Sequence, residues 1–184
     1  MILCFGEEPE AESVGDINNL TISPYQLELY MQLRAQTTTP IVLVLVEARP
    51  RIIDQAADSD AILMAYLPSS EGGQAVAEIL FGITNPSGRL SLTYPQYPND
   101  VGVPYFKTFT DTTTPLYEFG WGLSYTQFEY TQLTLSTNVL YLYDELEVSV
   151  TVTNVGNVAG KETVLLVCFW SILLMIIYDG TVSD

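Results

Sequence analysis

Hydrophobic and polar residues in the first half of the chain alternate between continuous apolar runs and helical spacings. The runs at residues 41–46 and 61–67 are almost wholly apolar, as is typical of strands buried on both faces of a parallel sheet. Residues 1–5 have the pattern of the last half of another buried strand, and residues 90–94 predict a further short one. The pattern therefore predicts a mostly parallel sheet.

Two segments between these runs predict helices. Ser23 and Gln26 are spaced to form a capping box at a helix start, and Pro24 suits the first helical position. Apolar residues recur at helical spacing between Gly73 and Gly82. Because strands and helices alternate, the first part of the chain is expected to be a layered α/β domain.

The pattern changes in the last third of the chain. Residues 128–131 and 146–152 alternate apolar with polar side chains, the period of half-buried antiparallel strands. A turn at 154–157 and a further strand over 162–166 continue this plan, so the segment predicts the beginning of a β-sandwich. The intervening residues 103–126 are rich in aromatic side chains and are expected to be an ordered connector.

Composition excludes several classes of function. The chain has 184 residues and a formal net charge of -16, so its surface repels a nucleic-acid phosphate backbone. It contains no histidine, which excludes a Ser-His-Asp or Cys-His catalytic set and a histidine-ligated metal within this chain. The two cysteines, Cys4 and Cys168, both lie in apolar runs and make neither a disulfide framework nor a zinc site.

Residues 164–178 form an almost wholly apolar tail. The tail is shorter than the roughly 20 residues that a membrane-spanning helix needs. Two interpretations of the tail remain possible: a buried strand that runs into an aberrant end, or a membrane anchor. We expect the first, so that the tail is not a functional membrane span. With the half-strand at its start, this tail leads us to expect that the chain is a fragment.

An acidic loop follows the first predicted strand. It carries Glu7, Glu8, Glu10, Glu12 and Asp16. In open α/β sheets ligands bind at the carboxyl ends of the strands, and clustered carboxylates there can hold the proton that a general acid needs. The alternative is a solvated acidic loop on an acidic protein.

Four segments in order along the chain resemble glycoside hydrolase family 3. They read GEEPEAESVGDINNLTI, PIVLVLVEARP, AILMAYLPSSEGGQAVAEILFGITNPSGRLSLTYP and PLYEFGWGLSYTQF. The resemblance is to β-glucosidases of the lysosomal type, which carry a carboxyl-terminal fibronectin type III-like domain. It extends from residue 6 to about residue 166.

The resemblance implies the fold and the division of the active site. Enzymes of this family join a TIM-like barrel to an αβα sandwich with a mostly parallel sheet, and then to the fibronectin-like domain. Residues 1–124 correspond to the sandwich, truncated at its amino-terminal side, and residues 125–184 to part of the fibronectin type III-like domain. The nucleophilic Asp belongs to the barrel, which is missing here, and the acid/base Glu to a sandwich loop.

The family pattern also suggests individual site residues. A loop reading GE-x-P-x-x-E-x-x-GD places the acid/base residue at Glu12, with Glu7 as the alternative. Glu7 and Asp16 would then be supporting residues that shape the loop. Arg49 matches the arginine of the family's GRP turn, although Ala48 replaces the usual glycine, and it is expected either to pair with the acidic loop or to lie at the surface.

The loop around Ser69 and the aromatic segment EFGWGLSYT can also be compared with the family pattern. Ser69 replaces a glycine of the usual PGSEGG loop and would be strained if its backbone needed a positive φ. The aromatic side chains of EFGWGLSYT are expected to pack within the protein rather than to contact sugar.

The resemblance implies a retaining, exo-acting β-glucosidase that hydrolyses terminal β-D-glucosyl residues and needs no cofactor. The expected partners are β-linked glucosides or oligosaccharides and the missing barrel, without nucleic acid or membrane, and the full-length protein is expected to be lysosomal or secreted. Another exo-glycosidase of the family, such as a β-xylosidase, and a non-catalytic carbohydrate- or partner-binding fragment remain the alternatives.

Overall fold

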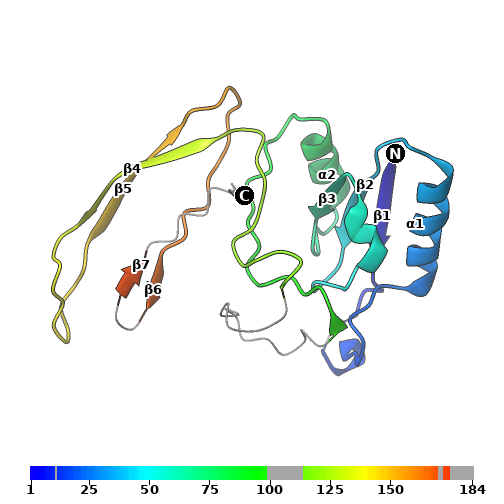
Figure 1. Ribbon diagram of the computed structural model, residues 1–184, viewed down its shortest axis with the longest axis horizontal. Coiled ribbons are helices and arrows are strands. Elements are labelled where there is room, and N and C mark those ends of the chain that lie inside the picture. The colour runs from blue at the N-terminus through cyan, green and yellow to red at the C-terminus, as the bar shows by residue number, and fades with distance from the viewer. Residues whose placement is uncertain (11, 99–113, 170–171, 175–184) are drawn as a thin grey trace. The chain divides into compact units, whose positions relative to one another are not determined.

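The computed structural model describes residues 1–10, 12–98, 114–169 and 172–174 (Figure 1). The chain forms two compact units, which are discontinuous in sequence. The first unit contains Met1–Glu78 and Leu90–Phe119, and the second contains Ile79–Arg89 and Gly120–Asp184.

A three-stranded parallel sheet organises the first unit. Its strands are β1 (Ile2–Gly6), β2 (Val42–Val46) and β3 (Ala61–Met64), in the order β1-β2-β3. The expected parallel sheet is therefore confirmed, with the opening residues of the chain as one of its strands.

Burial differs between the strands. Consecutive residues Leu43, Val44 and Leu45 of β2 are all buried, so both faces of this central strand are covered, as its sequence predicted. Strand β3 was expected to be equally buried, but its residues are only partly buried or exposed. The reason is its position, because β3 has one neighbouring strand in the described sheet.

Helix α1 spans Pro24–Gln36 and begins where the sequence predicted. The predicted capping box does not form, since the Ser23 side chain makes no capping hydrogen bond. The Gln26 side chain instead donates from Nε2 to the carbonyl oxygen of Gly6, 2.9 Å away. Gln26 thus ties the start of the helix to the end of β1, a long-range contact that competes with the local cap.

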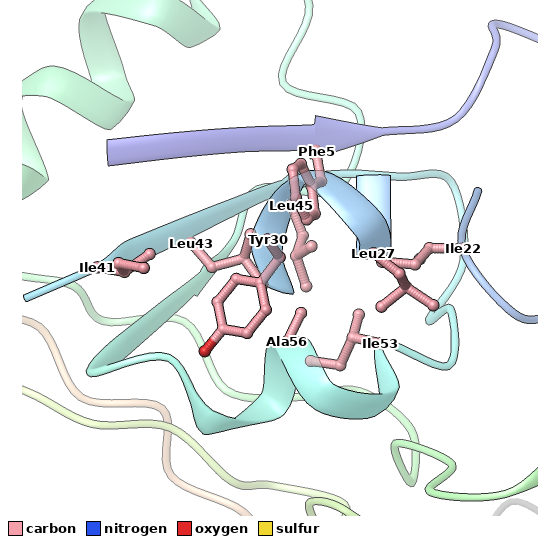
Figure 2. Packing of buried hydrophobic residues seen from close by; sticks show 9 residues of the cluster. All are labelled: Phe5, Ile22, Leu27, Tyr30, Ile41, Leu43, Leu45, Ile53 and Ala56. Atoms are coloured by element: carbon pink, nitrogen blue, oxygen red, sulfur yellow. The ribbon is translucent and has the colours of Figure 1, made fainter. Parts of the chain in front are cut away.

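The hydrophobic core of this unit lies between the sheet, α1 and a 3₁₀ helix at Asp54–Asp58 (Figure 2). Burial of apolar side chains at about 25 cal/mol per Å² stabilises this arrangement. The core residues are Phe5, Ile22, Leu27, Tyr30, Ile41, Leu43, Leu45, Ile53 and Ala56.

The second helix and the segment 90–94 can also be compared with the elements that the sequence predicted. Helix α2 (Gly72–Leu80) is close to the predicted segment. The strand predicted over residues 90–94 does not form, and Tyr94 makes a single antiparallel bridge with Tyr117. The Tyr94 ring lies edge-on to the Tyr117 ring, with 5.9 Å between centroids, and this contact adds to the two backbone hydrogen bonds of the bridge, from Tyr94 N–H to Tyr117 O at 2.8 Å and from Leu116 N–H to Tyr94 O at 3.0 Å.

The described residues of the second unit contain two short antiparallel sheets, of which the alternating pattern predicted the first in sequence. Strand β4 (Phe128–Leu135) pairs with β5 (Val148–Asn154), and β6 (Val167–Phe169) pairs with β7 (Ile172–Leu174). Residues 162–166 were expected to form a strand, but the next strand begins only at Val167.

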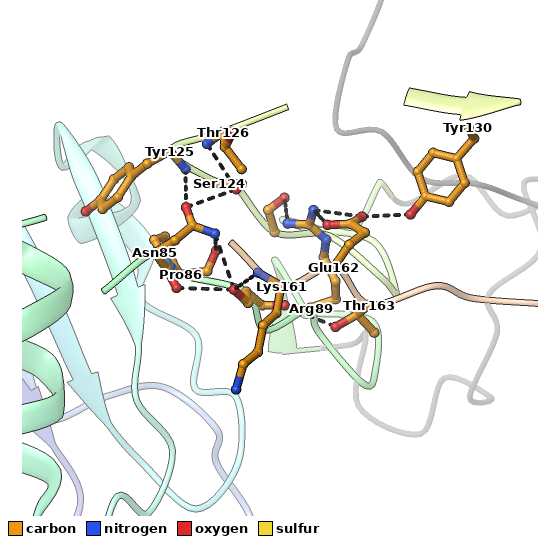
Figure 3. Close-up of polar contacts among 12 residues, drawn as sticks. Asn85, Pro86, Arg89, Ser124, Tyr125, Thr126, Tyr130, Lys161, Glu162 and Thr163 are labelled. Carbon is orange, nitrogen blue, oxygen red and sulfur yellow. Dashed lines mark hydrogen bonds and ion pairs between the residues drawn. The ribbon is translucent and has the colours of Figure 1, made fainter. Parts of the chain in front are cut away.

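The side chain of Glu162 forms a buried ion pair with Arg89 (Figure 3). Arg89 Nη2 lies 3.0 Å from Glu162 Oε2, and both side chains are at least nine-tenths buried. Arg89 also donates to the carbonyl oxygen of Gly122, and the Tyr130 hydroxyl donates to Glu162 Oε1 at 2.9 Å. Burial and this contact raise the pKa of Tyr130 to about 12. The side chain of Glu162 thus joins residues 89 and 130 of the second unit, and through Arg89 also residue 122.

Asn85 organises the preceding loop of the same unit (Figure 3). Its Oδ1 accepts hydrogen bonds from the backbone N–H of Tyr125 at 2.7 Å and from the Ser124 hydroxyl at 3.1 Å. Its Nδ2 donates to the carbonyl oxygen of Pro86 at 2.9 Å. A buried side-chain amide satisfied in this way fixes the loop.

The apolar tail lies partly outside the described residues, because 170–171 and 175–178 are not described. The same holds for 99–113, which include much of the predicted connector. Within the part of the chain that the structure describes, no helix is long and apolar enough to cross a membrane.

The structure confirms the expected strain at Ser69, whose φ is 60°. We expect Ser69→Gly to raise the free energy of unfolding by about 0.5–1 kcal/mol. The left-handed conformation costs a non-glycine residue roughly 1–2 kcal/mol, and glycine avoids this cost. Part of the gain is lost because glycine makes the unfolded chain more flexible and so loses more entropy on folding. Urea denaturation of the chain measures the change. Ser70→Gly is the matched control, because Ser70 is not among the residues with positive φ. Equal destabilisation by both substitutions would contradict the prediction.

Candidate functional site

The candidate site lies at the carboxyl-terminal edge of the parallel sheet. Glu7 follows β1 directly, and Glu47 follows β2 directly. The carboxyl ends of parallel strands meet at one edge of a sheet, where α/β proteins bind their ligands.

Close approach of the first two strands brings their ends together. A Cβ atom on Gly6 would lie only 2.7 Å from the carbonyl oxygen of Val46, so a side chain at this position would force the strands apart. The Glu7 backbone N–H donates to the same oxygen at 3.3 Å. Glycine at position 6 therefore allows the acidic loop to begin directly against the end of β2.

The guanidinium group of Arg51 holds both ends of the acidic loop. Its Nη1 donates to Glu7 Oε2 at 2.5 Å, at the start of the loop. Its Nε donates to the carbonyl oxygen of Leu20 at 2.9 Å, and its Nη2 donates to that of Thr21 at 2.8 Å, beyond the loop's end. Because the guanidinium is planar and rigid, one side chain fixes the two ends of the loop relative to each other.

Glu7 has further partners from the segment after β2. Its Oε1 accepts a hydrogen bond from the Ala48 backbone N–H at 2.7 Å and lies 3.7 Å from Arg49 Nε. Arg49 also donates from Nη1 to the carbonyl oxygen of Gly15, 2.9 Å away. Of the two positions expected for Arg49, the structure shows the one paired with the acidic loop.

Glu12 lies at a different kind of position. It is exposed and begins the 3₁₀ helix Glu12–Gly15, with a φ of 55° that non-glycine residues seldom adopt. Its carboxylate makes no hydrogen bond or ion pair with any described residue. The side chain of Asp16 is also exposed and has no such partner in the described ranges, as is true of Glu8 and Glu10. The structure therefore brings Glu7 and Arg49 together but shows no contact between either of them and Glu12.

Glu47 is a site residue that sequence reasoning missed. Its side chain is completely buried, and neither carboxylate oxygen has a hydrogen-bond partner among the described residues. Burial raises the pKa of Glu47 to about 7, an effect that the negative charge of Glu7 increases and that the positive charge of Arg51 and the nearby Arg51 backbone N–H oppose. The signal was available, because Glu47 directly follows the buried run 41–46 at the edge where ligands bind.

Tyr94 connects a distant segment to the same cluster. Its hydroxyl donates to the carbonyl oxygen of Arg51 at 2.8 Å, and burial raises the pKa of Tyr94 well above its ordinary value. Neither Arg51 nor Tyr94 was singled out by sequence reasoning. For Arg51, the only signal was a second arginine two residues after Arg49.

The loop is fixed at both ends, and the carboxylates of Glu8, Glu10, Glu12 and Asp16 have no partner among the described residues, whereas that of Glu7 is bound. An exposed carboxyl group of this kind can donate or accept a proton at a bound ligand. Within the described residues, no group of three or more acidic, cysteine or histidine side chains is placed to hold a metal ion.

Comparisons with known proteins find similar sequences and a similar structure. The C-terminal domain of glycosyl hydrolase family 3 matches residues 1–125. A lysosomal beta glucosidase of Dictyostelium discoideum is 49% identical over 182 residues, which cover 90% of this chain and 22% of that protein. A beta-xylosidase of Formosa agariphila is 34% identical over 163 residues, covering 82% of this chain and 22% of that protein.

A solved structure shows the same fold. The beta-glucosidase from Listeria innocua in complex with glucose superposes with a TM-score of 0.72 at 30% identity, covering 86% of this chain and 25% of that one. The chain thus spans about a quarter or less of the length of these relatives.

The ion pair between Glu7 and Arg51 is expected to stabilise the first unit. Glu7→Gln should lower the free energy of unfolding by about 2–3 kcal/mol, somewhat below the 3–5 kcal/mol typical of a fully buried pair, because both side chains are 13% exposed. Glu8→Gln, at an exposed neighbouring position, should change it by less than about 0.5 kcal/mol. Urea unfolding of the three proteins measures the difference, and equal stability of the two variants would refute it.

Proposed function

The chain belongs to glycoside hydrolase family 3, and from this premise we propose that it is the acid/base-bearing part of a retaining, exo-acting β-glucosidase. The observation that carries the proposal is the exposed, unpartnered carboxylate of Glu12 on a loop whose two ends are held by Arg51. Such a loop presents a proton donor while keeping its backbone in place.

Double displacement at a sugar requires two carboxyl groups about 5–5.5 Å apart. One attacks the anomeric carbon, and the other protonates the leaving oxygen and then activates water. Both oxygens of Glu7 already bind donors within the chain, at Arg51 and Ala48. Glu12 has no such partners among the described residues. This difference favours Glu12 over Glu7 as the acid/base residue, and the contacts of Glu7 and Arg49 suit supporting roles. The supporting role proposed for Asp16 rests on the family pattern alone.

The nucleophile is proposed to be an Asp on a barrel domain outside this chain. The chain's 22% share of its Dictyostelium relative supports this proposal, since it leaves room for a large further domain. We also propose that residues 1–124 form the αβα sandwich of the family and residues 125–184 part of a fibronectin type III-like domain.

Terminal β-D-glucosyl residues are the proposed substrate, and the higher identity of the lysosomal beta glucosidase favours them over xylosides. The beta-xylosidase relative makes another exo-glycosidase activity the nearer alternative. A non-catalytic carbohydrate- or partner-binding role is the alternative of another class. A lysosomal or secreted location is proposed for the full-length protein, in line with the compartment that its relative's name gives.

The isolated 184-residue chain should not hydrolyse an aryl β-glucoside, because one carboxyl group cannot perform double displacement. The measurement is release of the aryl alcohol by the purified chain, compared with a protein in which the barrel is restored. Enzymatic turnover by the chain alone would contradict the division of the active site.

In the barrel-restored protein, Glu12→Ala should slow hydrolysis of substrates with poor leaving groups by about 10²–10⁴-fold, the usual effect of losing a general acid. Substrates with activated leaving groups should still form the covalent intermediate. Azide needs no general base to attack and should then restore turnover.

Glu10→Ala is the matched control, because Glu10 is exposed in the same loop. It should keep nearly full activity. If Glu7→Ala showed the leaving-group dependence and azide rescue while Glu12→Ala remained near wild type, the roles of Glu7 and Glu12 would be exchanged.

A further inference from the structure

Glu47 is a buried acid that the proposed chemistry does not use. It is completely buried at the end of β2, and both of its oxygens lack hydrogen-bond partners in the described part of the chain. A buried carboxyl group whose oxygens are not fully hydrogen-bonded destabilises the folded state, and its presence calls for an explanation.

The backbone on either side of Glu47 binds Glu7. The carbonyl oxygen of Val46 accepts from the Glu7 backbone N–H at 3.3 Å, and the Ala48 backbone N–H donates to Glu7 Oε1 at 2.7 Å. Any displacement of Glu47 therefore changes the position of Glu7, at the start of the acidic loop.

The charged and titratable groups around Glu47 come from three segments. Glu7 follows β1, Arg51 follows β2, and Tyr94 belongs to the segment that bridges to Tyr117. Arg51 interacts electrostatically with both Glu7 and Glu47, so the two carboxyl groups compete for one guanidinium. In the observed arrangement Arg51 binds Glu7.

We propose that Glu47 is a positioning residue of the acidic loop, and that its buried carboxyl group controls whether Arg51 holds the two ends of that loop. While Glu47 carries a proton, Arg51 binds Glu7 and the carbonyl oxygens of Leu20 and Thr21. Loss of the proton places a second negative charge beside Arg51, which weakens its bond to Glu7 and loosens the loop that carries Glu12. The consequence for catalysis rests on the proposed function, whereas the effect on the loop does not.

The direction of the pH effect follows from the pKa of Glu47. Burial raises this pKa from 4.5 to about 7, so the folded chain retains a proton that the unfolded chain has lost. The stabilisation is complete below about pH 4.5 and is lost as the pH rises through about 7. The neighbouring phenols remain neutral over this range, because burial raises the pKa of Tyr66, Tyr94 and Tyr117.

The test uses the 184-residue chain, its Glu47→Gln variant and Glu8→Gln as the control. Carboxyl carbon NMR follows the titration of Glu47, and amide hydrogen exchange follows the Ala48 N–H that binds Glu7. In the wild-type chain and the control, protection of Ala48 from exchange, corrected for intrinsic rates, should fall with the midpoint of Glu47, and we expect a fall of about tenfold, a factor equivalent to one pKa unit. In Glu47→Gln it should stay constant.

An equal fall in protection in Glu47→Gln, or titration of Glu47 without any change at Ala48, would overturn the inference. If Glu47→Gln does not fold, the wild-type chain alone still tests the inference. The pH midpoint of the Glu47 titration must then coincide with the pH midpoint of the change in Ala48 exchange. In the barrel-restored protein, Glu47→Gln should keep its kcat at acidic pH and lose the decline in kcat around pH 7, with KM less affected. An inactive barrel-restored protein with the expected Ala48 behaviour would refute the proposed function and leave the positioning role intact.

Discussion

The guanidinium group of Arg51 is the constraint on which the candidate site depends. It joins a carboxylate at the start of the acidic loop to two backbone carbonyl oxygens beyond the loop's end. Lysine cannot replace this geometry, because its ammonium is a single point charge and lacks the fixed fork of donors. The backbone of Arg51 is held in turn, since its carbonyl oxygen accepts a hydrogen bond from Tyr94. The loop is therefore positioned by contacts between three segments that are distant in sequence.

The sheet provides the surroundings in which these contacts are strong. Leu43, Val44 and Leu45 of β2 are buried, and so is Glu47 just beyond the strand, although Val46 between them is exposed. Charges in these buried surroundings interact in a medium of reduced polarity. The same burial disfavours the ionised form of Glu47 and makes its carboxyl group sensitive to Arg51 and Glu7. One structural feature, the strand end, thus accounts for both the ion pair and the buried acid.

Sequence reasoning succeeded where the determining interactions are local. The aliphatic run 41–46 predicts a strand because burial on both faces requires apolar residues at every position, and the structure confirms it. It failed where a distant partner decides. Gln26 could cap its own helix, but Gly6 lies within reach in the fold and takes the donor. The pattern over 162–166 predicts a strand, but the next strand begins only at Val167, and the Glu162 side chain forms a buried ion pair with Arg89, 73 residues away, which the local pattern could not show.

The site shows the same division between local and distant determinants. Glu12 and Arg49 follow from motif positions, and the pairing of Arg49 with the loop was one of the expected arrangements. The sequence does not show that Arg51 holds the loop, because the carbonyl groups that Arg51 binds lie some 30 residues away along the chain.

The placement of the few arginines in this acidic chain explains why the Glu7 carboxylate is paired and the Glu12 carboxylate is not. The net charge is -16, yet all four arginines, Arg34, Arg49, Arg51 and Arg89, pair with a carboxylate. Two of them act on Glu7, which is thereby committed to holding the loop. Glu12 lies in the same loop, but none of these arginines pairs with it. A group that gives up and regains a proton in each cycle must be free of a fixed cation, whereas a group that anchors a loop must keep one. The distribution of arginines therefore marks Glu7 as the anchoring carboxylate, and it is compatible with the acid/base role proposed for Glu12, which like Glu8, Glu10 and Asp16 has no arginine beside it.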